Sequence, residues 1–208
     1  MITYEQRLDA DRRWAFLEGS MHFEGGSAVH KTLTKLAAKL DEIGVPYAIA
    51  GGMALFFHGY RRFTEDVDVV VTADGLRRIH EELEGRGYVP PFAGSKNLRD
   101  AETGVRIEFL ITGQFPGDGL PKPVAFPDPG EKQTVIEGAR FVPLQTMIEM
   151  KLASGMTNPR RLRDFSDVQD VIQNLALDAD FADRLDPYVR EKYRELWRAV
   201  RDDPNREP

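Results

Sequence analysis

The sequence predicts an α/β (α+β) fold, in which a small mixed β-sheet is followed by a helical C-terminal part. Two short apolar segments, "VPYAIA" at 45–50 and "VDVVV" at 67–71, have the composition of buried strands. Two further segments, 96–111 and 134–142, alternate in polarity around a glycine turn and predict hairpins. From Pro143 onward the pattern is helical throughout.

The first half of the chain alternates helices and strands. Apolar residues at helical spacing predict helices over 3–19, 28–43 and 74–86. The segment 51–60, "GGMALFFHGY", lies between the two apolar strands and should begin as a glycine turn and continue as a helix. We place His30 at the surface of the second helix, since it has no second ligand at metal spacing.

The rest of the chain contains two hairpins, a long loop and the C-terminal helices. The hairpin turns are expected at Thr103-Gly104 and at Glu137-Gly138. Residues 112–131 are rich in proline and glycine and predict an irregular loop, which is long enough to be mobile or functional. We therefore expect two domains, 1–142 and 143–208, with fraying from residue 202 onward.

Composition excludes several classes of protein. The 208-residue chain has a formal net charge of −6 and no cysteine, so disulfides and thiolate metal sites are excluded. It has no apolar run of the ~18 residues that a membrane helix needs, and its first residues are too charged for a signal peptide. These features predict a cytoplasmic protein without a membrane partner. The acidic charge disfavours a wholly basic nucleic-acid-binding surface, although "NPRRLRDFSD" at 158–167 is a local basic patch.

Two acids interrupt the second apolar strand. Side chains alternate across a strand, so Asp66 and Asp68 should point to the same face, about 7 Å apart along the backbone. Two neighbouring carboxylates repel each other, and one must take up a proton unless a cation neutralises them. Mg²⁺ is the natural candidate because it prefers oxygen ligands and leaves room for phosphate oxygens.

A third carboxylate is expected on a neighbouring strand. Glu108 is flanked by apolar residues in "VRIEFLI" at 105–111. A strand that buries Ile107 and Phe109 on one face presents Glu108 and Arg106 on the other. If this strand lies beside the one that carries Asp66 and Asp68, three carboxylates surround one or two metal ions.

A glycine pair stands at the start of the first half's third helix. Gly51 and Gly52 follow an apolar strand directly. Glycine lets a ligand approach the backbone closely, and the unpaired N–H groups at a helix start favour an anion. A triphosphate could bridge this helix start and the metal ions, although such a pair is more often only a tight turn.

The stretch "GGMALFFHGYRRFTEDVDVVV" at 51–71 resembles the signature of the DNA polymerase β-like nucleotidyltransferases, in which a glycine turn precedes Asp-x-Asp. The pattern formed by Arg62, Thr64, Asp66 and Asp68 is more similar to one branch, the AbiEii-type toxin nucleotidyltransferases and their uncharacterised bacterial relatives. The resemblance implies a nucleotidyltransferase core over the first part of the chain, with the active site in a cleft beside the helical part.

Two later motifs of that branch have weaker counterparts, so that the resemblance covers roughly residues 45–175. "KLASGM" resembles a Lys-x-x-Ala helix, with the alanine one position early, and "RRLRDFSDV" resembles an Arg-rich helix that ends in Asp-x-x-Asp. The matching residues are Lys151, Ala153, Arg161, Arg163, Asp164 and Asp167. A lysine on such a helix is by default solvated, and the two aspartates could simply pair with neighbouring arginines.

The resemblance implies a role for each matching residue. Asp66, Asp68 and Glu108 would bind Mg²⁺, and Glu108, where the family more often has Asp, would also be the possible base. The phosphates of an NTP such as ATP would meet the glycine pair, Arg62, Thr64 and Lys151. Residues that would bind the acceptor or support the site are Arg161, Arg163, Asp164 and Asp167. Chemically this is two-metal nucleotidyl transfer.

The acceptor stays open at this stage. An AbiEii-like toxin with an antitoxin partner would modify RNA, such as a tRNA 3′ end, which the Arg160–Arg163 patch could hold. A protein hydroxyl (AMPylation) or a small molecule, as in antibiotic-modifying nucleotidyltransferases, are alternatives. A module that binds an NTP or a partner without catalysis is the alternative of another class, and it would be expected to have lost the three carboxylates.

Overall fold

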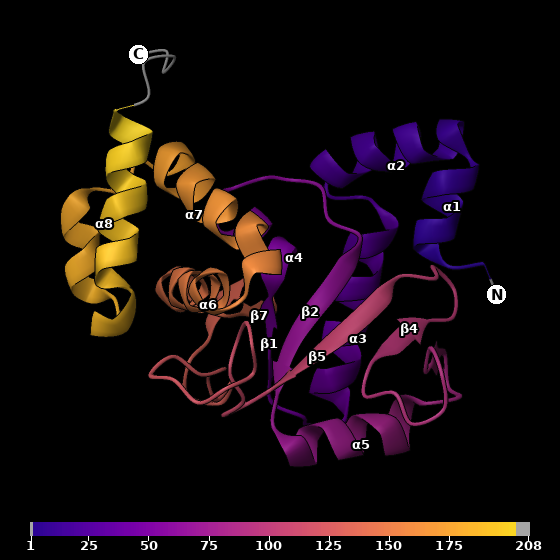
Figure 1. Ribbon diagram of the computed structural model, residues 1–208. Helices are drawn as coiled ribbons and strands as arrows, with labels where there is room; N and C mark the ends of the chain where they lie inside the picture. The colour runs from indigo at the N-terminus through magenta and orange to yellow at the C-terminus, as the bar shows by residue number, and fades with distance from the viewer. Residues whose placement is uncertain (1, 203–208) are drawn as a thin grey trace.

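The computed structural model describes residues 2–202 and contains, within that range, a seven-stranded mixed sheet in the order β3-β4-β5-β2-β1-β7-β6 (Figure 1). The central strand β2 is antiparallel to β1 and parallel to β5. The α/β prediction is therefore confirmed. The strands are β1 (Tyr47–Ala50), β2 (Asp66–Val71), β3 (Tyr88–Val89), β4 (Leu98–Asp100), β5 (Arg106–Ile111), β6 (Thr134–Ile136) and β7 (Ala139–Phe141).

Helices lie on both sides of this sheet and at its ends. The α-helices are α1 (Tyr4–Ala10), α2 (Arg12–Phe23), α3 (Ala28–Glu42), α4 (Gly51–Phe57), α5 (Ala73–Leu83), α6 (Leu144–Thr157), α7 (Leu162–Asn174) and α8 (Pro187–Arg201). Two 3₁₀ segments, η1 (Pro159–Arg161) and η2 (Ala179–Arg184), precede α7 and α8. Within the described range, no helix is both long and apolar enough to span a membrane.

The helix expected over 3–19 is two helices. Asp11 ends α1 and caps α2, because its side-chain carboxylate accepts a hydrogen bond from the backbone N–H of Trp14 at 3.0 Å. Aspartate competes well for free backbone N–H groups at a helix start, which favours a break there. α2 then continues to Phe23, beyond the expected end.

The alternation of β2 separates the core from the site. Val67 and Val69 are fully buried, and α3 and α5 cover one face of the sheet (Figure 1). Asp66 and Asp68 point to the other face and are half-buried. The same alternation in β5 buries Ile107 and Phe109 and leaves Glu108 half-buried.

The helices α6, α7 and α8 form a group on one side of the sheet, and α1 and α2 lie on the opposite side (Figure 1). The chain enters α6 just after Val142, whose N–H donates to the carbonyl of Ile49 at 2.8 Å. His58 donates from Nε2 to the carbonyl of Val142 at 2.8 Å, so α4 also fixes this entry. The division into domains at residue 142 stays a prediction. Of the residues expected to fray, Asp202 ends α8, and the others, 203–208, lie outside the described residues.

His30 is buried, which corrects the expected surface position. Only 6% of it is exposed, because α2 and α4 cover the face of α3 on which it lies. His22, Ser27 and His30 form a hydrogen-bonded row in which the hydroxyl of Ser27 lies 3.3 Å from Nδ1 of His22 and 2.9 Å from Nδ1 of His30. Both imidazole rings also pack against the ring of Phe56. The row forms part of the packing beneath the segment that leads into β2.

Candidate active site

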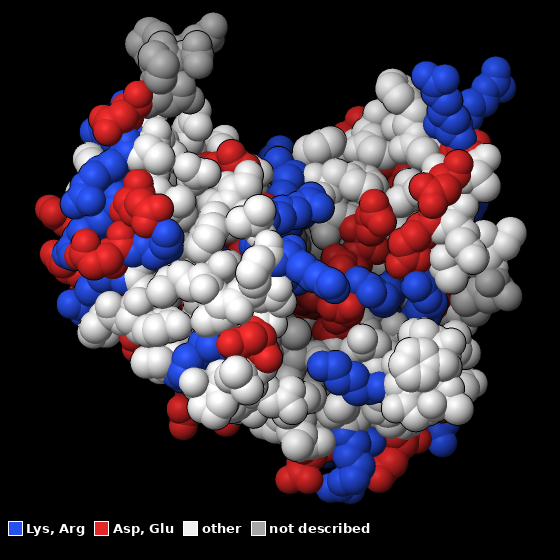
Figure 2. Space-filling view, viewed as in Figure 1, with Lys and Arg blue, Asp and Glu red and all other residues white. Residues whose placement is uncertain are grey.

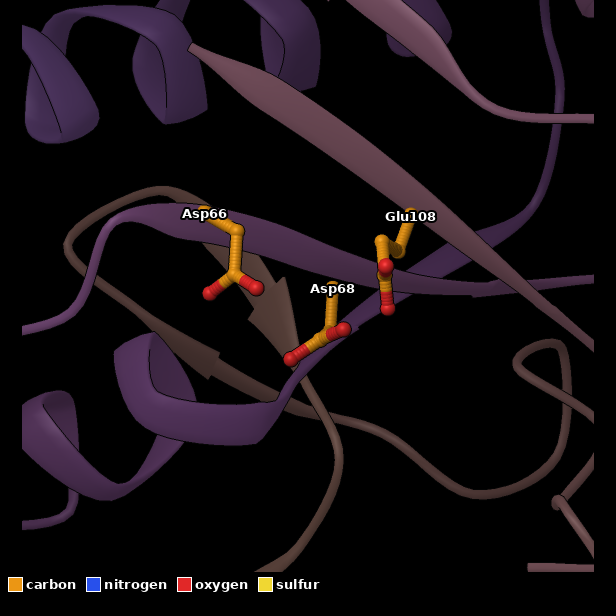
Figure 3. A group of neighbouring side chains, drawn as sticks. All are labelled: Asp66, Asp68 and Glu108. Atoms are coloured by element: carbon orange, nitrogen blue, oxygen red, sulfur yellow. The ribbon is translucent and has the colours of Figure 1, made fainter. Parts of the chain in front are cut away.

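The parallel pairing of β2 with β5 brings three carboxylates together. The register places Asp66 beside Arg106 and Asp68 beside Glu108. One oxygen from each of Asp66, Asp68 and Glu108 lies within 4.8 Å of the others. Figure 3 shows the three side chains pointing from the two strands toward a common point. The predicted neighbouring strand is therefore β5, and the pairing register accounts for the meeting of residues 40 positions apart.

Gly51 makes room for one of these carboxylates. It has a φ of +61°, and a Cβ atom at this position would lie 1.8 Å from Oδ2 of Asp68. Gly52 is similarly close to Thr64, since its Cβ would lie 2.8 Å from the Thr64 hydroxyl. The glycine pair is thus required by the packing of the side chains on and before β2, and it brings the backbone at the start of α4 next to the carboxylates.

The segment that precedes β2 orients Asp66 and reaches the helical group. The Thr64 hydroxyl donates to Oδ1 of Asp66 at 2.9 Å. The Arg62 guanidinium contacts both carboxylate oxygens of Asp167 on α7, at 2.9 Å from Nε and 3.1 Å from Nη2. Thr64 therefore contacts one of the three converging carboxylates, whereas Arg62 contacts a carboxylate outside that group.

Asp68 holds its proton more tightly than an ordinary aspartate. Burial, together with the charges of Asp66 and Glu108, raises its pKa from 3.8 to about 7, although Lys151 and Arg161 oppose the increase. Close carboxylates in a poorly solvated place cannot all ionise unless positive charge is added. The site is therefore short of positive charge, and a divalent cation would supply it.

These three side chains fit a divalent metal ion. They offer only oxygen ligands, which hard cations such as Mg²⁺ prefer, and their oxygens are close enough to share one ion. The fit rests on the convergence of the three carboxylates and on the raised pKa of Asp68.

Arg106 is a site residue whose partners the sequence did not reveal. Its Nη2 atom lies 3.2 Å from Oδ2 of Asp66 and 2.9 Å from Oε1 of Glu108, so one guanidinium bridges two of the three carboxylates. The signal in the sequence was its i, i+2 spacing from Glu108, which placed both on one face. Its pairing with Asp66 depends on the β2–β5 register, which sequence spacing does not give.

Lys151 is buried between two carboxylates of α7, although a lysine on such a helix is usually exposed to solvent. Its Nζ atom lies 2.9 Å from Oδ1 of Asp164 and 2.6 Å from Oδ2 of Asp167. Arg161 donates from Nε to the other oxygen of Asp164 at 2.9 Å. Although burial alone raises the pKa of Asp164, Lys151 and Arg161 hold it below its usual value. Asp164 therefore pairs with a neighbouring arginine, as one of the two alternatives expected. Asp167 instead pairs with Lys151 and with Arg62, which are distant in sequence.

The surface around the carboxylates is hollowed between the side of α1 and α2 and the side of α6–α8. Figure 2 shows acidic side chains in the floor and along one wall of this hollow and basic side chains along the other. On the acidic wall, burial and the charges of Glu5, Asp66 and Asp9 raise the pKa of Glu65, whereas Arg163 lowers it. Arg160, Arg161 and Arg163 are exposed at the start of α7.

Comparison with known proteins was made by sequence and by structure. No family model matches the sequence, and no curated protein matches it. Among solved structures, ANT(2'')-Ia in complex with adenylyl-2''-tobramycin has a TM-score of 0.51 at 16% identity, covering 82% of this chain and 95% of that one.

Two further structures are similar over a comparable length. A nucleotidyltransferase-like protein from Paracoccidioides brasiliensis has a TM-score of 0.48 at 17% identity and covers 84% of this chain and 88% of that one. JHP933 from Helicobacter pylori has a TM-score of 0.47 at 17% identity and covers 83% of this chain and 89% of that one.

The chain therefore has the same fold as ANT(2'')-Ia over most of its length. At this identity the likeness establishes the fold alone, and the chemistry has to be argued from the residues of the site.

Proposed function

We propose that this protein is a Mg²⁺-dependent nucleotidyltransferase that moves a nucleotide from an NTP to an acceptor hydroxyl. The observation that carries the proposal is the convergence of Asp66, Asp68 and Glu108, on the fold shared with ANT(2'')-Ia, into a group whose negative charge is not balanced. A module that only binds a partner has no need for three mutually repelling carboxylates. Bound Mg²⁺ would activate the acceptor oxygen and stabilise the pyrophosphate that leaves, and two ions are proposed.

Each residue of the site has its own role in the proposed reaction. Glu108 accepts the proton of the acceptor hydroxyl, whose oxygen forms a bond to the α-phosphorus while the bond from that phosphorus to the pyrophosphate breaks. Asp66 and Asp68 hold the metal ions, with Thr64 orienting Asp66 by its hydrogen bond. Gly51 and Gly52 let the triphosphate approach the backbone at the start of α4. Arg62 and Lys151 add positive charge near the phosphates, and their ion pairs with Asp167 hold both side chains in place.

An RNA end, such as a tRNA 3′ end, is the acceptor that the basic wall favours. Arg160, Arg161 and Arg163 are exposed at the start of α7, and Arg161 and Arg163 are near enough to Asp68 and Glu65, respectively, to lower their pKa values. This group of arginines can contact one or two phosphates. With a net charge of −6 on the chain, a short single-stranded end is a better partner than a long duplex. In this reading the protein belongs with the AbiEii-type toxins, and its partner is a cognate antitoxin.

A small cationic molecule is the second candidate, and the acidic wall favours it. Glu5, Asp9 and Glu65 lie close enough to one another to raise the pKa of Glu65. ANT(2'')-Ia was solved with adenylyl-2''-tobramycin, the nucleotidylated form of an amine-rich small molecule. Amines would pair with the acidic wall, while the triphosphate lies toward the arginines. A protein hydroxyl remains the third acceptor class.

The experiment is nucleotide transfer with purified protein, Mg²⁺ and each of the four NTPs labelled at the α-phosphate. Total tRNA, a set of amine-rich antibiotics and a protein lysate serve as separate acceptors. We expect label on one acceptor class with the wild type and none with Asp66→Asn/Asp68→Asn. Asp74→Asn is the matched control, because Asp74 is an exposed aspartate on α5, remote from the carboxylates. If the wild type transfers no label and binds neither metal nor NTP, the enzyme proposal is refuted, and only the assignment of the fold remains.

A further inference from the structure

Arg106 stands where a metal ion would compete with it. Its Nη2 atom contacts Asp66 at 3.2 Å and Glu108 at 2.9 Å, and these are two of the three carboxylates that fit a divalent ion. A guanidinium and a metal ion draw on the same negative charge. The more firmly Arg106 neutralises these carboxylates, the less charge is left to attract an ion.

We propose that Arg106 is a resident counter-cation of the carboxylate group: it offsets part of the charge of Asp66 and Glu108 in the metal-free protein, a divalent ion displaces it, and the freed guanidinium pairs with the phosphates of the NTP. This inference rests on the proposed function. It assigns Arg106 two alternative sets of partners, the carboxylates before the metal and nucleotide arrive and the phosphates afterwards.

The position of Arg106 allows this exchange. Its side chain is 39% exposed, so the guanidinium can move without unpacking the core. Lys151, which also lies between two carboxylates, has only 9% of its side chain exposed and is held on both sides by α7. Arginine also suits the second partner, because its planar fork of N–H groups matches phosphate oxygens.

The exchange couples the two ligands. A metal ion that binds alone must displace Arg106 and leave it without a carboxylate partner. A metal ion that binds together with the NTP leaves Arg106 with new phosphate partners, so that each ligand strengthens the binding of the other. The site would then take up metal chiefly with the nucleotide.

The test measures metal affinity directly, by the electron paramagnetic resonance signal of free Mn²⁺, for the wild type and Arg106→Gln. Both are titrated with and without a non-hydrolysable NTP analogue. Without nucleotide we expect Arg106→Gln to bind Mn²⁺ about ten-fold more tightly than the wild type, which corresponds to the loss of one competing cation. With the nucleotide analogue the order should reverse, because the variant lacks the phosphate contact.

The matched control is Arg99→Gln. Arg99 lies opposite Arg106 on the next strand, β4, but pairs with Glu5, at 2.8 Å, and with none of the three carboxylates. The Arg99→Gln substitution removes the same charge one strand further from the carboxylates. It should change the affinity for Mn²⁺ by less than about three-fold. Arg106→Lys keeps the charge without the fork, so its affinity for Mn²⁺ alone should stay close to that of the wild type even if Arg106→Gln does not fold.

The outcomes separate this inference from the proposed function. If Arg106→Gln binds Mn²⁺ more weakly than the wild type, or equally well, or if Arg106→Lys binds the ion alone much more tightly than the wild type, Arg106 is not a competing cation and the inference is wrong. In those cases the metal site and the proposed function stand. If the wild type binds no Mn²⁺ with or without nucleotide, the metal site itself is refuted, and both proposals fail together.

Discussion

The ammonium group of Lys151 lies 2.6 Å from Oδ2 of Asp167, and less than a tenth of either side chain is exposed. Asp167 also accepts from Arg62, which stands just before β2, and Lys151 also contacts Asp164. The helices α6 and α7 and the irregular segment before β2 thus share one network of charges. The lysine that the sequence resemblance assigns to phosphate binding is, in this structure, also a structural cation.

Lys151→Met should therefore destabilise the protein. Removing one member of a buried ion pair typically costs about 3–5 kcal/mol. We expect a loss toward the lower end, because Asp164 keeps Arg161 and Asp167 keeps Arg62 as partners. Denaturation by urea, with and without Mg²⁺ and NTP, measures this cost. Lys151→Met/Asp164→Asn should recover part of the stability, since it removes one of the two carboxylates that lost a cationic partner. A loss below about 1 kcal/mol, with transfer abolished, would contradict the structural role and assign Lys151 to the substrate.

Asp68→Asn should stabilise the metal-free protein at alkaline pH. The pKa of Asp68 is raised from 3.8 to about 7, so the folded state retains a proton that the unfolded state has already released between these values. Stability from this group therefore falls as the pH rises from 3.8 to 7. Asparagine imitates the protonated form, and the gain should be roughly 1–3 kcal/mol at pH 8 and near zero at pH 4.

Addition of Mg²⁺ distinguishes this effect from general stabilisation. Thermal unfolding of the wild type should shift upward with Mg²⁺, because the ion binds only the folded state. Asp68→Asn should show no such shift and no nucleotide transfer. If Asp68→Asn were strongly destabilised at pH 8 without metal, the aspartate would be a structural residue instead.

Gly51→Ala should damage both the fold and the metal site. The added Cβ would lie 1.8 Å from Oδ2 of Asp68, and the φ of +61° disfavours any side chain. We expect a loss of about 1–3 kcal/mol in the free energy of unfolding and weaker Mn²⁺ binding. Gly19→Ala is the control. Its Cβ meets no atom within 4 Å and it lies inside α2, so alanine should raise stability by about 0.5–1 kcal/mol.

His30 should make the protein less stable in mild acid. Burial lowers its pKa from 6.5 to about 4, and the charge of His22 acts in the same direction. Between these values the unfolded state binds a proton that the folded state refuses, so stability falls as the pH decreases from 6.5 to 4. His30→Leu should flatten this part of the stability-versus-pH curve by about 1–3 kcal/mol. An unchanged slope would show that His30 titrates normally.

Sequence patterns predicted the three carboxylates and the described strands other than β3, because these depend on alternation or apolar runs within one segment, and they predicted the glycine pair from its place between a strand and a helix. Asp66, Asp68 and Glu108 stand out as acids flanked by apolar residues, and the structure brings them together. The pairing of Arg106 with Asp66, the burial of Lys151 and the burial of His30 depend on which element covers which face. That information arises from packing between segments far apart in the sequence, so local spacing did not reveal it.

The segment that leads into β2 is anchored from both ends of the chain. The carbonyl of Arg62 accepts from Nε2 of His22, 40 positions earlier, and its guanidinium binds Asp167, 105 positions later. Two residues further on, Thr64 holds Asp66. A shortened chain that lacks α1 and α2, or one that lacks α7, would therefore keep most of the sheet and still misplace a metal ligand. In mutational scans, substitutions in these remote helices should interact non-additively with substitutions at Thr64.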